Sequence, residues 1–358
     1  MKSKIVYLHT IGFTSKNLLK IQESEQDFED FYDNFGIKEL KELGIKEEKI
    51  EKILENKRKL DTLKLDQLLK NLKVEIITLN DSKYPQNLKN LYTPPFVLYI
   101  RGKIKNKNFF SIVGTRKPTT YSEKIIKNFI PALVENGFGI VSGGAYGVDS
   151  LVHKTTLENN GYTLSVIGTG IDKNYPDSNK KLYDEIIEKD GCILSIFPIG
   201  TPPNMYNFPI RNDIIAGLSD GILVTEAGEK SGTLITAKLA LDIGKDVFVV
   251  PGDIFKKESA GINLLIKNTM AKPVFCAEDI LEEYNINLEN PKIQEIKEIE
   301  FEDQLEQKIY ELLQKESLNS TEICQKLEME VGEITYRLSI LEIGGFIKLR
   351  NDGEYSIQ

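Results

Sequence analysis

The stretch that decides the fold is IVSGGAYGVDSLVH, residues 140–153. It begins with the β-branched pair Ile140 and Val141, passes through a loop with three glycines, and continues as a helix-like segment from Val148. A strand that ends in a glycine-rich loop and opens a helix is a common phosphate-binding unit. The stretch therefore predicts an anion site, and the phosphate could belong to a dinucleotide cofactor, a small nucleotide or a nucleic-acid backbone.

Similar strand-like runs recur on both sides of this stretch and alternate with helix-like segments. The runs are FFSIVG (109–114), FGIVSG (138–143), TLSVIG (163–168), CILSIF (192–197), GILVTE (221–226), DVFVVPG (246–252) and, more weakly, PVF (273–275). Strands that are apolar on both faces and alternate with helices form a parallel sheet covered on both sides. We expect an extended Rossmann-like α/β domain over 76–285, doubly wound and mostly parallel. It begins with a turn-rich segment and a strand at 96–100.

The first 75 residues have apolar positions at helical spacing, interrupted by Gly36 and Gly44. Short helices joined by glycine-containing turns suit a helix-hairpin-helix domain or a sterile-alpha-motif-like (SAM-like) domain. The charge of this segment is nearly balanced, which leaves both nucleic-acid contact and protein contact open.

The chain ends with an acidic linker at 286–302 and a small domain at 303–358. Helices are expected at 304–315, 320–327 and 331–343, with Asn319 as a cap, followed by a hairpin around Asn351, Asp352 and Gly353. Three helices and a hairpin make a winged-helix-like domain. From Glu302 onward there are 12 acidic and 6 basic residues, so protein contact is favoured over reading of the DNA major groove.

Composition limits the possible classes of protein. The three cysteines are far apart and fit no zinc spacing, and the two histidines argue against a histidine-rich metal site. These residues lead us to expect no bound metal. We also expect a cytoplasmic protein, because no apolar run is long enough to span a membrane and no signal peptide is apparent. The net charge of −8 argues only mildly against nucleic-acid binding, since a local basic pocket can exist within it.

A nicotinamide dinucleotide is disfavoured by the order of the glycines. Folds that bind such a dinucleotide have G-x-G-x-x-G after their first strand and an acidic residue about 20 positions later. Here Gly143, Gly144 and Gly147 follow the second run of the series, and the residues around Val166 are apolar. We therefore predict no cofactor. Asp149 either caps the following helix or takes part in the site, and a structural role is favoured for His153.

Candidate phosphate ligands follow several of the predicted strands. Arginine forms bidentate bonds to phosphate, and helix starts offer amides and hydroxyls. An aromatic side chain beside arginine also suits base stacking. The candidates are Arg116, Ser142, Gly143, Gly144, Asn179, Lys180, Phe208, Arg211, Asn212, Ser231 and Asn263.

Taken together, these motifs resemble the DNA-processing protein A family, also called DprA or Smf. The matching strings are LYTPPFVLYIRG, SIVGTR, IVSGGAYGVDSLVH, GTGIDKNYPDSN, FPIRNDIIAGLSD, EAGEKSGTLITA and VVPGDIFKKESAGINLLI, in the family's order over roughly residues 80–280. The resemblance implies a dimeric, non-enzymatic protein that binds and protects incoming single-stranded DNA and loads the RecA recombinase in natural transformation. It also implies that Arg116 contacts phosphate, and that Lys180, Arg211 and the Gly143–Gly144 loop line the same pocket.

Two positions depart from the family pattern. Ile196 stands where the family often has Glu, and Asp213 stands where it often has Arg. The second change removes a positive charge beside the expected pocket, which predicts weaker DNA binding or a different arrangement. With 19 basic and 20 acidic residues from Lys105 to Asp279, binding must depend on where the charges lie and should be strongly salt-dependent.

The alternative is an enzyme similar to the LOG-type phosphoribohydrolases, which share the SGG loop and a Gly-Thr helix start. Their motif P-G-G-x-G-T-x-x-E carries an essential glutamate. Here Gly232 and Thr233 are followed by Ala237 and Lys238, and no glutamate stands at that spacing. A nucleotide-sensing protein that does not bind DNA is a third class left open by the sequence.

Overall fold

A computed structural model of the chain describes residues 2–286, 301, 303–350 and 353–357. The chain divides into two compact units, residues 1–289 and 290–358, and each is described by itself.

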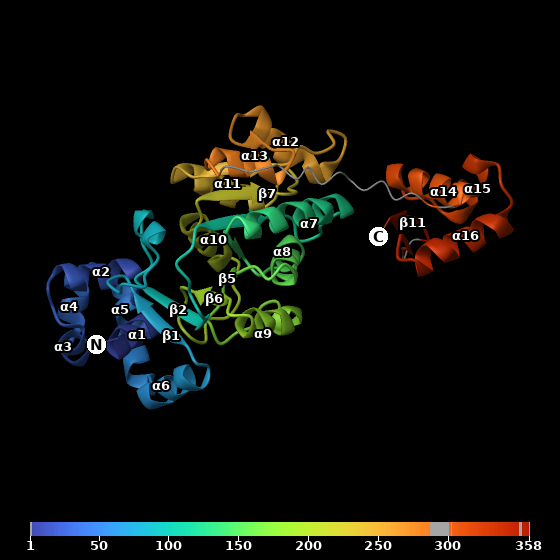
Figure 1. Ribbon diagram of the computed structural model, residues 1–358. Coiled ribbons are helices and arrows are strands. Elements are labelled where there is room, and N and C mark those ends of the chain that lie inside the picture. Colours follow the sequence, from blue (N-terminus) through green and yellow to red (C-terminus); the bar gives the residue numbers. More distant parts are fainter. Residues whose placement is uncertain (1, 287–300, 302, 351–352, 358) are drawn as a thin grey trace. The chain divides into compact units, whose positions relative to one another are not determined.

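The first unit is built on a nine-stranded sheet in the order β1-β2-β6-β5-β4-β3-β7-β8-β9 (Figure 1). The strands are β1 (Glu75–Thr78), β2 (Val97–Gly102), β3 (Phe109–Val113), β4 (Gly139–Ser142), β5 (Thr163–Ile167), β6 (Cys192–Ser195), β7 (Gly221–Val224), β8 (Asp246–Val249) and β9 (Lys272–Pro273). Strands β3 to β9 are mutually parallel, whereas β2 pairs antiparallel with β6 and β1 pairs antiparallel with β2. The predicted α/β class with a mostly parallel sheet is confirmed.

The direction of winding reverses in the middle of the sheet. From β3 the chain adds β4, β5 and β6 outward on one side, and then returns to place β7 on the other side of β3. The carboxyl ends of β3 and β7 therefore flank the point where the connections diverge. In open α/β sheets, ligands bind in the crevice at such a point.

Helices cover both faces of the sheet because its strands are apolar on both sides. Ile140 packs with α7 and α8, and its neighbour Val141 packs with α10 on the opposite face. One face carries α10 (Asn207–Leu218), α11 (Thr233–Asp242) and α12 (Ala260–Lys267); the other carries α7 (Thr120–Glu135), α8 (Val148–Glu158), α9 (Lys180–Glu188) and α13 (Ala277–Glu283).

The N-terminal segment is helical, as its apolar spacing predicts. It forms α1 (Lys2–Ile11), α2 (Ser15–Glu23), α3 (Phe28–Asn34), α4 (Ile37–Glu42), α5 (Glu47–Lys59) and α6 (Thr62–Asn71). These helices share a hydrophobic cluster with Tyr99 of β2 and Leu182 of α9. The SAM-like or helix-hairpin-helix class and the boundary at residue 75 stay predictions.

The segment after α6, expected to be a turn-rich connection, also contains a strand. β1 pairs with β2 from Glu75↔Ile100 to Thr78↔Val97 and forms one edge of the sheet. Four residues are too few to show a clear alternation, so the sequence pattern alone does not reveal this strand. Pairing with β2 supplies the hydrogen bonds that define it.

The second unit contains α14 (Gln304–Lys315), α15 (Ser320–Leu327), α16 (Val331–Ile343), β10 (Ile347–Leu349) and β11 (Tyr355–Ile357). Strands β10 and β11 pair antiparallel, and Asn319 caps α15 through the backbone amide of Glu322, as predicted. The winged-helix class stays a prediction. The turn residues Asn351 and Asp352 and nearly all of the acidic linker at 286–302 lie outside the described residues. No helix in the described ranges has the length and hydropathy to cross a bilayer.

Candidate functional site

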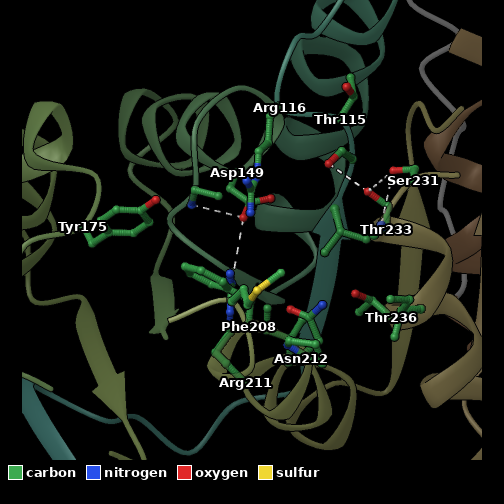
Figure 2. Close-up of a pocket in the computed structure, with 18 of the residues that line it drawn as sticks. Thr115, Arg116, Asp149, Tyr175, Phe208, Arg211, Asn212, Ser231, Thr233 and Thr236 are labelled. Atoms are coloured by element: carbon green, nitrogen blue, oxygen red, sulfur yellow. Dashed lines mark hydrogen bonds and ion pairs between the residues drawn. The ribbon is translucent and has the colours of Figure 1, made fainter. Parts of the chain in front are cut away.

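A pocket of about 760 Å³ opens at the carboxyl ends of β3 and β7, where the direction of winding reverses (Figure 2). The loop after β3 contributes Gly114, Thr115 and Arg116, and the first turns of α10 and α11 supply most of the remaining wall. An adjoining recess reaches Gly143, Gly168 and Pro176. The parallel sheet thus gathers loops that are more than 100 residues apart in the chain.

Two arginines lie close to one aromatic ring in this pocket. The guanidinium carbon of Arg116 is 5.6 Å from the centre of the Phe208 ring, and that of Arg211 is 6.0 Å from it. Such distances suit a cation–π contact, which holds the charged group over an apolar surface. Arg116 is exposed and, among the described residues, forms no hydrogen bond or ion pair. Its guanidinium is therefore available to an external anion.

Arg211 is in a different electrostatic environment. It is only 4% exposed, and its Nη1 lies 3.9 Å from Oδ2 of Asp149, which is also buried. Burial raises the pKa of the Asp149 carboxyl, while the Arg211 guanidinium and the Ala145 amide oppose that rise. The Arg211 Nε is buried and has no partner among the described atoms. Asp149 therefore holds the Arg211 guanidinium at the base of the pocket, and the Nε of that guanidinium can still donate a hydrogen bond.

Three glycines make room for parts of this site. A Cβ at Gly143 would overlap the Arg211 guanidinium, and a Cβ at Gly168 would lie 2.8 Å from the Phe208 ring. Gly147 has a φ of +78° and lies against the backbone of Arg116. In this structure, the space beside Gly143 is occupied by the protein's own arginine.

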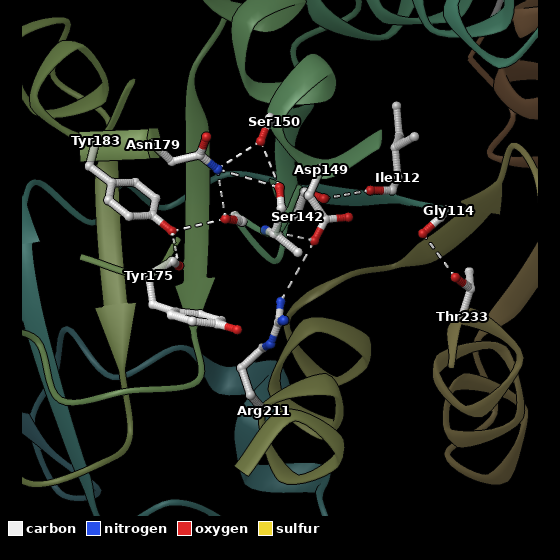
Figure 3. Close-up of polar contacts among 12 residues, drawn as sticks. Ile112, Gly114, Ser142, Asp149, Ser150, Tyr175, Asn179, Tyr183, Arg211 and Thr233 are labelled. Atoms are coloured by element: carbon white, nitrogen blue, oxygen red, sulfur yellow. Dashed lines mark hydrogen bonds and ion pairs between the residues drawn. The ribbon is translucent and has the colours of Figure 1, made fainter. Parts of the chain in front are cut away.

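A buried polar network fixes the glycine loop from behind (Figure 3). The Asn179 amide donates to the Gly144 carbonyl at 3.0 Å and to Ser150 Oγ at 2.7 Å. The Tyr183 hydroxyl lies 2.9 Å from the Gly144 carbonyl and 2.8 Å from the Tyr175 carbonyl. Ser142 Oγ donates to the Ile112 carbonyl at 2.8 Å. These bonds satisfy buried groups and hold the loop in one conformation.

The start of α11 is tied to the end of β3. The Thr233 hydroxyl donates to the Gly114 carbonyl at 2.9 Å, and Ser231 Oγ accepts from the Thr233 amide at 3.2 Å (Figure 2). This contact places the N-terminus of a helix, which favours negative charge, at the wall of the pocket.

The structure separates the predicted site residues into three groups. Arg116, Gly143, Phe208, Arg211, Asn212 and Ser231 line the pocket or its adjoining recess. Ser142, Gly144 and Asn179 take part in the buried network that holds the loop. Lys180 is exposed and does not line the pocket, and Asn263 bonds to the backbone of Gly252. Whether each residue touches DNA stays a prediction.

Asp213 does not lie on the pocket that its neighbour Arg211 enters. Side chains two residues apart on a helix point in nearly opposite directions. Asp213 of α10 therefore lines a second pocket, which Ile196 also lines. The two departures noted in the sequence therefore meet at one place, away from the arginines.

Several lining residues were not among the predicted ones. Tyr175, whose ring is 5.7 Å from that of Phe208, was interpreted only as part of a turn. Asn204 and Met205 precede α10, and Thr236 follows Thr233 by one helical turn. The sequence signal that could have revealed residues 203–206 is their position shortly before the FPIRN motif.

Asp149, left open between a cap and a part in the site, and His153, for which a structural role was favoured, both lie buried beneath the loop. The His153 Nδ1 is 2.6 Å from Thr163 Oγ1, and burial lowers the pKa of His153 to about 3. His153 is therefore neutral near pH 7 and packs within the fold. Within the described ranges, no group of His, Cys, Asp and Glu side chains could hold a metal ion.

The fold and the pocket define a Rossmann-like α/β protein with a pocket lined by two arginines. Residues 75–285 match the sequence profile of the family described as DNA recombination-mediator protein A, and the chain belongs to this family.

Relatives agree with that assignment. The chain is 39% identical over 231 residues to Protein Smf of Synechocystis, a match that covers 63% of this chain and 58% of that protein. It is 39% identical over 213 residues to the DNA processing protein DprA of Bacillus subtilis, covering 59% of this chain and 71% of that protein. The match thus spans little more than half of the Synechocystis relative.

Two solved structures are also similar. The DNA processing protein A of Streptococcus pneumoniae superposes with a TM-score of 0.68 at 33% identity, covering 79% of this chain and 98% of that one. The Helicobacter pylori DNA processing protein A, from a study of its single-stranded DNA binding mode, has a TM-score of 0.54 at 32% identity. That match covers 59% of this chain and 96% of that one.

Proposed function

We propose that this protein is a recombination mediator that binds single-stranded DNA with the pocket at the carboxyl ends of β3 and β7. The observation that carries the proposal is the Arg116–Phe208–Arg211 arrangement, because it combines two cations with an aromatic surface. Single-stranded nucleic acid is recognised by positive grooves that follow the backbone and by aromatic rings on which bases stack. The single-stranded DNA binding mode of the Helicobacter pylori relative supports the same substrate.

Each side of the pocket suits one part of a nucleotide. Among the described residues, the Arg116 side chain forms no hydrogen bond or ion pair, and it is exposed at the pocket, so it is suited to a backbone phosphate. Asn212 lines the same pocket, and its side chain forms no hydrogen bond with the described residues, which leaves its side-chain amide for a base edge or a phosphate. Ser231 offers a hydroxyl at the start of α11. DNA binding at this pocket requires no net positive charge on the whole chain.

The further parts of the proposal come from the family. We propose that the bound strand is delivered to a RecA-type recombinase, that the protein acts as a homodimer in the cytoplasm, and that it protects DNA taken up during transformation. We also propose that the pocket binds its ligand without transforming it. Among the described lining residues, the one carboxylate is Asp149, which is buried against Arg211 and is poorly placed to act as a base.

The test is fluorescence anisotropy of the full chain with labelled oligonucleotides of 20 nucleotides, single-stranded and double-stranded, over a series of salt concentrations. We expect preferential binding of the single strand and an affinity that falls steeply with salt. Equal affinity for both forms, or no binding at low salt, would refute the proposal. Release of free base from nucleoside monophosphates would instead favour the phosphoribohydrolase alternative.

A further inference from the structure

A second pocket, of about 710 Å³, lies within the first unit and has no part in the proposed DNA site. The turn between α1 and α2, the segment at 91–95, the residues that follow β6, and helices α10 and α11 all contribute to its wall. Five separate regions of the chain enclose it. Its volume falls within the range of about 300–1,000 Å³ that is typical of small-molecule sites.

The wall of this second pocket is mainly apolar. Its principal apolar side chains are Phe13, Leu91, Phe197, Ile214, Leu239 and Ile243. Phe13 and Ile214 are almost fully buried beneath it, so the floor is part of the folded core. Small-molecule sites commonly combine such a wall with a few placed polar groups that fix orientation.

Asp213 is the polar group that distinguishes this pocket. It is half-buried, and among the described residues it forms no hydrogen bond or ion pair. Burial alone raises the pKa of its carboxyl, because no nearby cation opposes the loss of water. A carboxylate that loses water without gaining a partner is energetically unfavourable.

The other ionisable groups of the wall do not neutralise Asp213. Lys16 and Asp242 are exposed at the rim, and within the described chain neither forms an ion pair. His9 is buried, its Nδ1 is 2.9 Å from the Tyr99 hydroxyl, and burial lowers its pKa to about 4. It is therefore neutral near pH 7. The wall thus holds two carboxylates against one ammonium group, and the inner carboxylate has no cation beside it.

We propose that the second pocket binds a small apolar molecule that carries a single amine cation. The ammonium group pairs with Asp213, and the apolar body packs against Phe197, Ile214 and Leu239. Pairing restores to the carboxylate the favourable contacts that burial removed, and the apolar wall gains contact area in the same event. Because Arg211 and Asp213 point to different sides of α10, this site is separate from the DNA pocket and does not depend on the proposed function.

The test uses three probes with the same ring and different charge: 2-phenylethylamine, 2-phenylethanol and phenylacetate. Each is titrated into the full chain at pH 7 without DNA, and binding is followed by ligand-observed NMR. We expect the amine to bind about tenfold or more tightly than the alcohol, since a hydrogen bond to a charged group has that strength. Phenylacetate should bind most weakly.

Two matched variants assign the effect to one carboxylate. Asp213→Asn should reduce the affinity for the amine to that for the alcohol, whereas Glu229→Gln, which removes an exposed carboxylate outside the pocket, should retain the preference. No binding of any probe, equal binding of all three to the unaltered protein, or an amine preference retained by Asp213→Asn would each overturn the proposal. The order of the three probes on the unaltered protein gives a result even if a variant fails to fold.

Discussion

Replacing Arg116 with alanine should separate DNA affinity from fold stability. Arg116 is exposed, forms no hydrogen bond or ion pair with the described residues, and lies 5.6 Å from the Phe208 ring centre. Its removal therefore leaves no buried charge unpaired. We expect the free energy of unfolding to change by less than about 0.5 kcal/mol, as for an ordinary surface substitution.

The expected loss of DNA affinity is much larger. A charge-assisted contact to phosphate contributes about 1.5–3 kcal/mol, which corresponds to a roughly 10- to 150-fold increase in Kd. Loss of one phosphate contact should also reduce the slope of log K against log salt by about 0.7 for a single strand. Anisotropy titrations at four or more salt concentrations measure both quantities.

Lys117→Ala is the matched control, because it removes one positive charge from the next position of the same loop but outside the pocket wall. We expect its affinity to stay within about threefold of the unaltered protein, since it loses only distant, screened attraction. Arg116→Lys keeps the charge without the bidentate geometry and should fall between the two. If Arg116→Ala and Lys117→Ala bind alike, the assignment of the pocket is wrong.

Further substitutions test the interior of the site and the buried histidine beneath it. Asp149→Asn leaves Arg211 buried without its carboxylate, so urea titrations should show that the free energy of unfolding falls by about 3–5 kcal/mol. The double variant Asp149→Asn with Arg211→Met should lose less stability. Equal losses would contradict a coupled pair. A Cβ at Gly143 would overlap the Arg211 guanidinium, so Gly143→Ala should cost about 1–3 kcal/mol and weaken DNA binding. Gly232→Ala meets no atom within 4 Å and should unfold like the unaltered protein. Burial lowers the pKa of His153 from 6.5 to about 3. Between these pH values the unfolded chain takes up a proton that the folded chain does not, so stability falls as the pH drops from 6.5 toward 3. At pH 5 this costs about 2 kcal/mol. His153→Asn should reduce the stability loss between pH 7.5 and pH 5 by that amount in urea titrations, and an unchanged loss would show that His153 is not the group responsible.

The sheet was predictable because its strands are local features. Runs such as FFSIVG and TLSVIG are apolar on both faces, and that pattern requires cover on both sides wherever the run lies in the sequence. The edge strand β1 was not predictable in this way. Its four residues acquire strand geometry only by pairing with β2, and the local pattern carries no record of that pairing.

The candidate site was predictable in part, and the division has a clear cause. Arg116 lies in a recognisable motif after β3, and Phe208 lies in another at the start of α10. The connections at the carboxyl ends of parallel strands meet at one edge of the sheet. Asn179 stands in an equally recognisable motif, yet its amide turns inward to the Gly144 carbonyl. The direction of a side chain depends on the partners that the fold brings to it.

The sequence by itself determined the α/β class, the glycine loop, the arginines of the SIVGTR and FPIRN motifs and the family to which the chain belongs. These features follow from local periodicity and from ordered motifs, which can be recognised without knowing which distant residues are in contact. Only the tertiary structure decided that Arg211 lies over Gly143 against Asp149, and that Asp213 faces a different pocket. Those facts depend on how α10 is rotated against the sheet, and that rotation is set by the packing of all the helices around it.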